Sequence, residues 1–385
     1  MIKSVNIKNI KGFISQKADL NNLTLFAGLN GMGKSTFIQS MLLLRQSYLS
    51  GRFPSKGGLL LNGDLTTIGI GKDLFAFDAD SDEIAINIDF DNDTNLLSSF
   101  NYDASSDTLP VKNFNCITTL EDISLFNNNF QYLHAERLSP ERDFFPGSLT
   151  NVKNGFLGKN GQFTAHYLAE NQRKDIANET LKHPTAKTLT LLDNVDAWLG
   201  ELSPGIKVRP QYTQQLNSST LTYNFTKGDE ISEDVKPANV GFGLTYILPV
   251  ITALLIAKPD DIVIIENPES HIHPSGQSSI AKLCCLSALT GAQIVIETHS
   301  DHIINGVLLS IKRGFYKLDN SIPQNKVAMY FIERIENSFS STIKPIVINE
   351  QGRIKNAPLN FFDQFAKDIK EMMNVNNESI HKQTS

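Results

Sequence analysis

The run Gly-Leu-Asn-Gly-Met-Gly-Lys-Ser at residues 28–35 constrains this chain more than any other part of it. The run matches the pattern G-x-x-x-x-G-K-[ST]. An apolar segment at 23–27 predicts a buried strand before it, and apolar residues spaced along 34–48 predict a helix after it. In such a strand–turn–helix, glycines let backbone N–H groups close around an anion, and the helix N-terminus adds positive partial charge. We therefore predict a cradle for nucleotide phosphates.

Each polar residue of the cradle has an expected role. Lys34 is expected to neutralise the β- and γ-phosphates, and the Ser35 hydroxyl to coordinate Mg²⁺. Thr36 adds a further N–H or hydroxyl group beside them. The predicted phosphate-binding residues are Asn30, Gly31, Gly33, Lys34, Ser35 and Thr36. The predicted cofactors are ATP and Mg²⁺.

A second apolar run, at 262–265, is followed by the carboxylate of Glu266. The run predicts a strand covered on both faces, with an acid at its C-terminal tip, which is where ligands bind in open α/β sheets. Glu266 therefore takes the position of a carboxylate near Mg²⁺, and we predict Ser35 and Glu266 as metal ligands. Asn267 follows at the position that usually holds the glutamate that activates water, and an amide cannot accept that proton.

The general base is left open by this arrangement. Glu269 is the nearest replacement and Glu266 is the alternative; without either, the site would bind nucleotide as a switch and hydrolyse it slowly. We favour some hydrolysis. His299 follows an apolar strand predicted at 293–296, where it is placed to sense the γ-phosphate. The predicted catalytic residues are Glu266, Asn267, Glu269 and His299.

A glycine-rich segment at 239–244 opens a helix predicted over 240–257. Its residues Gly241 and Gly243 would let a helix N-terminus approach the γ-phosphate of a nucleotide held by a second protomer. His271 and His273 stand close together in the sequence, but they follow Pro268 in a loop without a further ligand set. We therefore do not interpret them as a metal site.

Charge and composition exclude some classes of function. The chain has 35 basic and 41 acidic residues, so its net charge of −6 gives no overall attraction to nucleic acid or anionic membrane. Lys3, Lys8, Lys11 and Lys17 lie close together near the N-terminus, so nucleic acid stays a candidate partner. Three cysteines imply no disulfide framework, and the apolar run at 247–257 is too short to span a bilayer. We expect a cytoplasmic protein without a membrane partner.

Along the chain, the cradle is followed by the glycine-rich helix start, then by the strand that ends in Glu266, and then by a Thr-His-Ser run that contains His299. This order resembles the ABC-type ATPase head of the RecF, Rad50 and OLD group. More closely, it is similar to prokaryotic AAA family ATPases of that group with a small C-terminal domain of unknown function, as in Septu-type defence systems. The Glu-Asn-Pro-Glu variant resembles this subfamily. The segments that carry the resemblance are 61–64, 135–140, 241–243, 266–274, 352–354 and 361–364.

The resemblance implies an α/β P-loop NTPase of ABC-ATPase head type. We expect a β-rich N-terminal part, a mixed α/β insertion and a small C-terminal α/β segment with two strands and a final helix at about 359–373. The expected divisions are residues 1–65 for the first half of the head with the cradle, 66–237 for an insertion that is β-rich and then helical, 238–324 for the second half of the head, and 325–385 for a small C-terminal domain.

The resemblance also implies partners. Two heads would meet head to tail as a homodimer or a higher even oligomer, with Gly241 and Gly243 of one facing the cradle of the other. We expect an ATPase switch or scaffold in an anti-phage defence complex that controls an effector, such as a nuclease, encoded nearby. A RecF-like repair ATPase that binds duplex DNA is the alternative. A self-contained toxin or nuclease is a third, although Asp363 and Glu371 form no acidic cluster.

Overall fold

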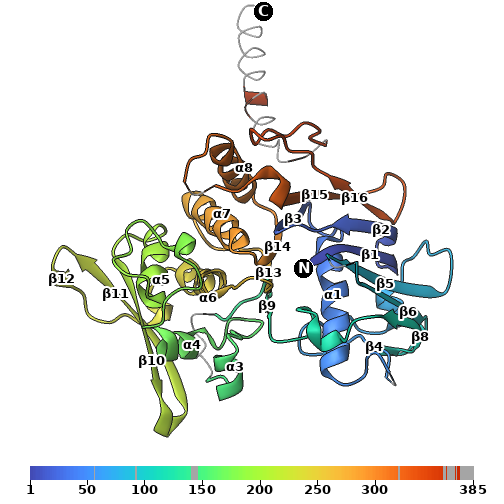
Figure 1. The fold of residues 1–385 in the computed structure, drawn as a ribbon, viewed down its shortest axis with the longest axis horizontal. Coiled ribbons are helices and arrows are strands. Elements are labelled where there is room, and N and C mark those ends of the chain that lie inside the picture. Colours follow the sequence, from blue (N-terminus) through green and yellow to red (C-terminus); the bar gives the residue numbers. More distant parts are fainter. Residues whose placement is uncertain are drawn as a thin grey trace, which may run out of the picture.

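A six-stranded, mostly parallel sheet forms the centre of the molecule (Figure 1). Its strands follow the spatial order β16-β15-β3-β14-β13-β9, and only β16 runs antiparallel to its neighbour. In chain order these strands are β3 (Leu23–Gly28), β9 (Phe130–Leu133), β13 (Ile262–Glu266), β14 (Gln293–Thr298), β15 (Val327–Arg334) and β16 (Ser341–Pro345). The strands predicted at 23–27, 262–265 and 293–296 are confirmed.

The computed structural model describes residues 1–55, 57–91, 93–139, 146–319, 321–358, 361, 369 and 371–372. The final helix predicted at 359–373 lies, except for single residues, outside these ranges, as do Pro140, Asp363 and residues 362–364 of the segments that carry the resemblance. Across the described ranges, every helix falls short of the length and apolarity that a bilayer crossing requires.

The central strand β13 is apolar on both faces because a different core covers each face. Successive side chains of a strand point to opposite sides. Ile262 and Ile264 join the core around α1 (Lys34–Leu49), whereas Val263 and Ile265 join the core on the other face. This second face is covered by α6 (Phe242–Ile256), α7 (Pro274–Leu289) and α8 (Asp301–Phe315), and α5 (Leu191–Gly200) packs against α6.

An antiparallel sheet of five strands lies on the far side of α1, with the order β2-β1-β5-β6-β8 (Figure 1). Ile7 and Ile86 face each other on neighbouring strands and turn into the core around α1, so this helix packs between two sheets. The strands are β1 (Ile2–Ile10), β2 (Phe13–Asp19), β5 (Glu83–Phe90), β6 (Asn95–Asn101) and β8 (Val111–Cys116). The short elements beside them are β4 (Leu59–Leu60), β7 (Thr108–Leu109) and α2 (Gly71–Leu74).

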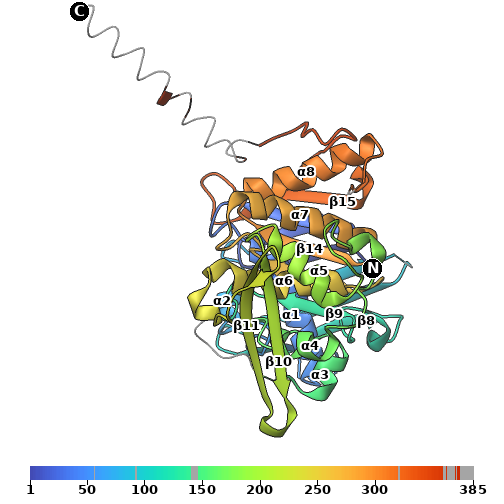
Figure 2. The ribbon, with the colours of Figure 1, turned by 90° about the vertical axis from the view of Figure 1, so that its left-hand side faces the viewer.

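The part on the other side of the central sheet combines short helices with a long hairpin. Figure 2 shows the hairpin of β10 and β11 running past the neighbouring helices. Its turn holds Asn217 at a φ of +42°, a conformation that asparagine tolerates better than most residues. The remaining elements are α3 (Leu149–Lys153), α4 (Thr164–Asn171), β10 (Ile206–Thr213), β11 (Ser218–Lys227) and β12 (Glu230–Ile231).

The range 66–237 is divided among three parts of the molecule instead of forming one insertion. Strands β5, β6 and β8 extend the sheet that β1 begins, and β9 hydrogen-bonds to β13 as the edge of the central sheet. The part from α3 to β12 stands outside both sheets, and β7 pairs with β4 in a separate two-stranded sheet. The order within this range is also β, then helical, then β again, because the hairpin follows α5. Backbone hydrogen bonding explains this division. The N–H and C=O groups at the edge of each sheet are satisfied when another strand pairs there, and strands of this range do so in both sheets.

The two strands predicted after residue 325 are confirmed as β15 and β16, but they do not form a separate unit. Strand β15 pairs in parallel with β3 over 327–332, so its backbone belongs to the central sheet. Residues Met329 and Phe331 of β15 also join the core beneath α6 to α8. The predicted boundary at 325 therefore separates strands that hydrogen-bond to each other.

Candidate functional site

The loop between β3 and α1 turns so tightly that its conformation requires glycine. Gly28, Gly31 and Gly33 have φ values of +150°, +73° and +101°, which residues with a Cβ rarely adopt. A Cβ atom at Gly28 would also lie 2.3 Å from the backbone oxygen of Ile332 on β15. The predicted cradle therefore has the tight backbone that its glycines imply, at the carboxyl end of a central strand.

Lys34 lies buried in the first turn of α1, with 3% of its surface exposed. Its Nζ donates a hydrogen bond to the backbone oxygen of Leu29, 2.6 Å away across the loop. Burial lowers the pKa of Lys34, and the negative charges of Glu297 and Glu269 oppose that change. The ammonium group is thus held inside the loop and close to two carboxylates.

The hydroxyl of Ser35 donates to Oε1 of Glu297, 3.0 Å away. Glu297 is buried near the end of β14, directly beside Glu266 of β13 in the register of the sheet. Burial and the charge of Glu266 raise the pKa of Glu297 to about 7, against the hydrogen bond from Ser35 and the charge of Lys34. The other oxygen, Oε2, is buried without a hydrogen-bond partner among the described residues.

Glu297 was not among the residues predicted from the sequence. The signal that could have found it is an acid inside an otherwise apolar, buried strand, because glutamate is almost never buried without a role or a partner. Its position two residues before His299 puts it at the edge where the predicted site lies.

Glu266 is 5% exposed and turns toward β9. Its Oε1 accepts from the Tyr132 hydroxyl at 3.0 Å, and its Oε2 accepts from the backbone N–H of Ala135 at 3.2 Å. Nε2 of His134 lies 3.8 Å from Oε2. Both oxygens of the predicted metal ligand are thus occupied by donors of β9 and the residues after it, while Glu297 receives the Ser35 hydroxyl.

The structure brings Glu269 and His299 together. The backbone N–H of His299 donates to Oε1 of Glu269 at 2.7 Å. Oε2 of Glu269 is buried without a partner among the described residues, and burial raises the pKa of this carboxyl. Burial and then the charge of Lys34 lower the pKa of His299. Asn267 lies between these groups in the left-handed conformation, at φ +44°, and its Oδ1 is likewise buried and unpaired within the described part.

Arg137 holds the turn after β13 in place, a role that the sequence did not indicate beyond its inclusion in the segment 135–140. Its Nη2 donates to the backbone oxygen of Glu266 at 2.6 Å, and its Nη1 to that of Asn267 at 3.3 Å. The guanidinium lies over the ring of Tyr246 in α6, 5.2 Å from the centroid. Burial lowers the pKa of Arg137 to about 10. This buried cation connects the start of α6 with the acidic turn.

Gly241 and Gly243 lie at the start of α6, and neither lines the cavity of the cradle in the same chain. A Cβ atom at Gly243 would lie 2.2 Å from the backbone oxygen of His271, whereas a Cβ at Gly241 would meet nothing within 4 Å. The ring of Phe242, 42% exposed, packs against His271 with 4.7 Å between centroids. Gly243 therefore packs within its own chain, and Gly241 faces open space. His273 caps α7 by accepting from the Ser275 N–H.

A cavity of about 500 Å³ lies over the cradle. One wall is formed by residues 30–36, with Glu297 and His299 beside them. Lys11, Phe77, Arg334 and Phe339 also line the cavity. This volume falls within the range of sites that hold a small molecule. All of the predicted cradle residues from Asn30 to Thr36 line it, so the loop opens into a space that a nucleotide could occupy.

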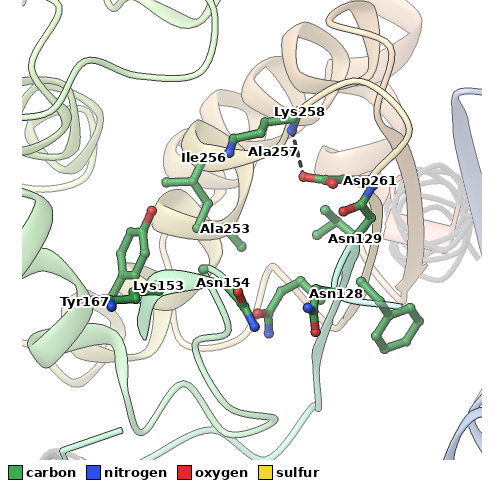
Figure 3. Close-up of a pocket in the computed structure, with 14 residues that line it drawn as sticks. Asn128, Asn129, Lys153, Asn154, Tyr167, Ala253, Ile256, Ala257, Lys258 and Asp261 are labelled. Carbon is green, nitrogen blue, oxygen red and sulfur yellow. Dashed lines mark hydrogen bonds between the residues drawn. The ribbon is translucent and has the colours of Figure 1, made fainter. Parts of the chain in front are cut away.

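A second cavity, of about 240 Å³, lies at the amino ends of β9 and β13, whereas the cradle lies at the carboxyl end of β3 (Figure 3). Asn129 and Asp261 border it where these strands begin, and Lys258 and Tyr167 face it from the helical side. The Lys258 backbone N–H donates to Asp261 at 2.9 Å. None of the predicted site residues lines this cavity. Because ligands of parallel sheets bind at the carboxyl ends of strands, the cradle is the stronger candidate site.

The lysines considered as a nucleic-acid patch are partly paired with acids. Nζ of Lys8 lies 3.8 Å from Asp80, and Nζ of Lys17 lies 3.4 Å from Asp89. Lys11 instead donates to Gln39 at 2.6 Å and lines the cradle cavity. These contacts neutralise much of the positive charge that binding to duplex DNA would need. They therefore argue against DNA binding by these lysines.

Comparison with known structures supports the architecture. A crystal structure of the Smc head bound to the C-winged helix domain of ScpA has a TM-score of 0.54 and 14% identity, covering 91% of this chain and 98% of that one. A second Smc head, with an extended coiled coil and bound to the C-terminal domain of ScpA derived from Pyrococcus furiosus, has a TM-score of 0.51 and 14% identity, covering 97% and 99%. A search of the curated proteins finds no match. These similarities confirm the predicted α/β P-loop fold of ABC-ATPase head type.

Family models cover most of the chain. Residues 322–372 match the family described as "Protein of unknown function (DUF3696)", which agrees with the predicted C-terminal segment of unknown function. Residues 23–305, which include the predicted cradle, the strand that ends in Glu266 and the histidine predicted as a switch, match a second family. The chain belongs to this second family, described as "AAA domain, putative AbiEii toxin, Type IV TA system", and has the fold of an ABC-type ATPase head.

Proposed function

We propose that this protein binds and hydrolyses ATP with Mg²⁺ and that its nucleotide-bound form pairs head to tail with a second copy. The observation that carries the proposal is the hydrogen bond from Ser35 to Glu297, with Lys34 of the same loop beside them. It joins the glycine-built loop to a buried acid at the carboxyl edge of the central sheet. That pairing of a phosphate cradle with buried carboxylates is the arrangement that nucleotide hydrolysis needs.

The residues around the cradle fit Mg²⁺. Three of the buried acceptor atoms that lack a hydrogen-bond partner among the described residues belong to the turn after β13 and the end of β14: Oδ1 of Asn267, Oε2 of Glu269 and Oε2 of Glu297. Carboxylate, amide and hydroxyl oxygens are the ligands that Mg²⁺ prefers. Ser35 and Glu297 would hold the ion, with Glu266 behind them. Bound there, Mg²⁺ would neutralise charge on the β- and γ-phosphates.

Glu269 is the residue that we assign as proton acceptor. The His299 N–H fixes Oε1 of Glu269, which leaves Oε2 free to receive a proton from water. Arg137 holds the backbone of the turn that carries it. The amide of Asn267 can orient a water molecule but cannot accept its proton.

The biological role that we propose is a nucleotide-driven switch or scaffold in an anti-phage defence complex, controlling a separate effector encoded nearby. The family description, which names a toxin of a toxin–antitoxin system, supports this setting. The Smc heads with similar folds are described as bound to domains of ScpA, so a head of this shape can carry a protein partner. Co-purification of the protein with the product of a neighbouring gene tests this role, and duplex binding without such a partner would contradict it.

Steady-state ATP hydrolysis by the purified protein tests the proposed activity. Wild type is compared with Glu269→Gln, Asn267→Glu and Lys34→Ala. We expect turnover in wild type and a loss of about 100-fold or more in Glu269→Gln, because the amide cannot accept the proton. Lys34→Ala should bind no ATP, since the cradle loses its cation.

Two outcomes would change the assignment. Equal turnover by wild type and Glu269→Gln would show that Glu269 is not the proton acceptor. Tight ATP binding without turnover in wild type, together with activity gained in Asn267→Glu, would make the protein a nucleotide-held scaffold. Unchanged ATP affinity in Lys34→Ala would contradict the cradle itself.

A further inference from the structure

Two phenylalanines that line the cavity over the cradle are unusually exposed for such large apolar side chains. Phe77 is 80% exposed and Phe339 is 64% exposed. Their rings lie against each other, with 4.7 Å between centroids and an interplanar angle of 56°. Both line the same cavity as the cradle. Apolar aromatic surface gathered at the wall of a polar cavity favours a flat apolar ligand group.

The aromatic pair is assembled from two loops that are far apart in the sequence. Phe77 follows α2, and Phe339 lies between β15 and β16. The hydroxyls of Ser338 and Ser340 both donate to Oδ2 of Asp78, at 3.2 and 3.1 Å. These bonds fasten one loop to the other beside the rings. The exposed pair is therefore a built feature of the cavity and not the end of a free loop.

Two cationic side chains and one ring of a second stacked pair line the same cavity. Lys11 and Arg334 line the same cavity, and both are positively charged donors. Phe75, which also lines the cavity, stacks on Tyr102 with 3.9 Å between centroids and an angle of 14°. The cavity thus offers aromatic faces for stacking and cationic groups for an electron-rich ring or for oxygens.

We propose that Phe77 and Phe339 form a platform that receives the base of the nucleotide whose phosphates occupy the loop at residues 28–35. The inference rests on the proposed nucleotide binding and names the subsite for its base. A nucleoside triphosphate has a polyanionic end and one planar aromatic end, and the predicted phosphate cradle and the aromatic pair line one and the same cavity. Stacking on aromatic rings tolerates different bases, because every base has a π face.

The test compares ATP with inorganic tripolyphosphate, which has the phosphates but no base. Binding of each, with Mg²⁺, is measured calorimetrically for wild type and for the double variant Phe77→Ala with Phe339→Ala. We expect the Kd for ATP to rise about tenfold in the double variant, as loss of base stacking implies, with the Kd for tripolyphosphate unchanged. Phe315→Ala, an exposed aromatic outside the cavity, is the matched control and should change neither value.

A fluorescent reporter gives a second readout that does not depend on removing side chains. The chain has a single tryptophan, Trp198, which is buried in the core on the other face of the central sheet. Phe77→Trp adds an exposed one, and wild-type fluorescence is subtracted. We expect ATP to quench the new tryptophan and tripolyphosphate to leave it unchanged, because only the base would stack on the ring.

Each outcome decides between the platform and its alternatives. Equal loss of ATP and tripolyphosphate binding in the double variant would mean that the pair supports the fold of the cradle, and the platform would be overturned. Unchanged ATP affinity in the double variant, with no quenching in Phe77→Trp, would also overturn the platform. The two rings would then be assigned to contact with another protein. If wild type binds neither compound, the proposed nucleotide cradle itself fails.

Discussion

At the scale of single residues, the site is defined by acids that the fold forces together. Glu266 and Glu297 are neighbours across two strands, and both are at most 6% exposed. Like charges at such a distance in a buried setting oppose each other's ionisation, which is one reason why the pKa of Glu297 is raised. Lys34 supplies the nearest positive charge in the loop. A divalent cation would relieve this repulsion.

This arrangement predicts that Glu297→Gln weakens the response to Mg²⁺. The amide keeps the size of the side chain and can still accept from Ser35, but it removes a negative charge and a strong metal ligand. We expect about tenfold more Mg²⁺ to be needed for half-maximal ATP binding, measured by titrating Mg²⁺ at fixed ATP. Glu230→Gln, on an exposed strand, is the control. An unchanged Mg²⁺ midpoint would exclude Glu297 as a ligand.

At the scale of elements, a buried acid connects helix α5 to strand β10 of the hairpin. Asp196 of α5 accepts from the backbone N–H of Val208 on β10 at 2.7 Å, and Nζ of Lys207 lies 3.4 Å from its other oxygen. Asp196 is 6% exposed. Burial raises the pKa of this carboxyl to about 6, against these two favourable contacts. The free energy of ionising Asp196 is therefore higher in the folded chain than in the unfolded one.

The sign of this effect gives a prediction on pH. Because the folded pKa lies above the unfolded value, folding binds protons between about pH 4 and pH 6, and the stability contributed by Asp196 is lost as pH rises through that window. Asp196→Asn cannot titrate. Relative to wild type, the variant should gain free energy of unfolding from pH 4 to pH 7 by on the order of 2 kcal/mol.

Denaturant unfolding of both proteins at pH 4, 5, 6 and 7 measures this difference. Asp229→Asn, an exposed turn position, should show a difference from wild type that stays constant over the same range. A constant difference for Asp196→Asn as well would mean that its carboxyl titrates alike in the folded and unfolded chains.

At the scale of the whole molecule, Gly241 and Gly243, the two glycines predicted to face a second protomer, have different surroundings. Gly243 is packed against the backbone of His271, so any side chain there would disturb its own chain. Gly241 has open space around it and an ordinary φ of −55°. Head-to-tail pairing is therefore tested at Gly241 and not at Gly243.

We expect Gly241→Asp to bind ATP as wild type does and to fail to pair. Its carboxylate would face the γ-phosphate of the partner and repel it. Light scattering in the Glu269→Gln background, with and without Mg²⁺–ATP, measures the pairing. Gly200→Asp, at another glycine with open space, should still pair. Dimers formed equally well by both variants would contradict the proposed interface.

The prediction from sequence succeeded where the signal lies in neighbouring residues. The loop at 28–35, the strands around it and the helices α1 and α6 follow from glycine spacing and apolar period, which depend on local conformation. The predicted boundaries of the chain fall between strands that pair with each other, because sheet pairing is not local. Strand β9 joins β13 across a long stretch of chain, and β15 joins β3 from near the other end.

The sequence by itself determined that this chain has a phosphate-binding loop between a strand and a helix, and that an acid and a histidine end two other buried strands. Only the tertiary structure decided which acid meets the loop. Ser35 and Glu297 are separated by 262 residues, and Phe77 and Phe339 come from equally distant loops. Such contacts depend on the order in which strands pair, because β14 lies beside β3 and carries Glu297 to Ser35. No local pattern of residues encodes that order.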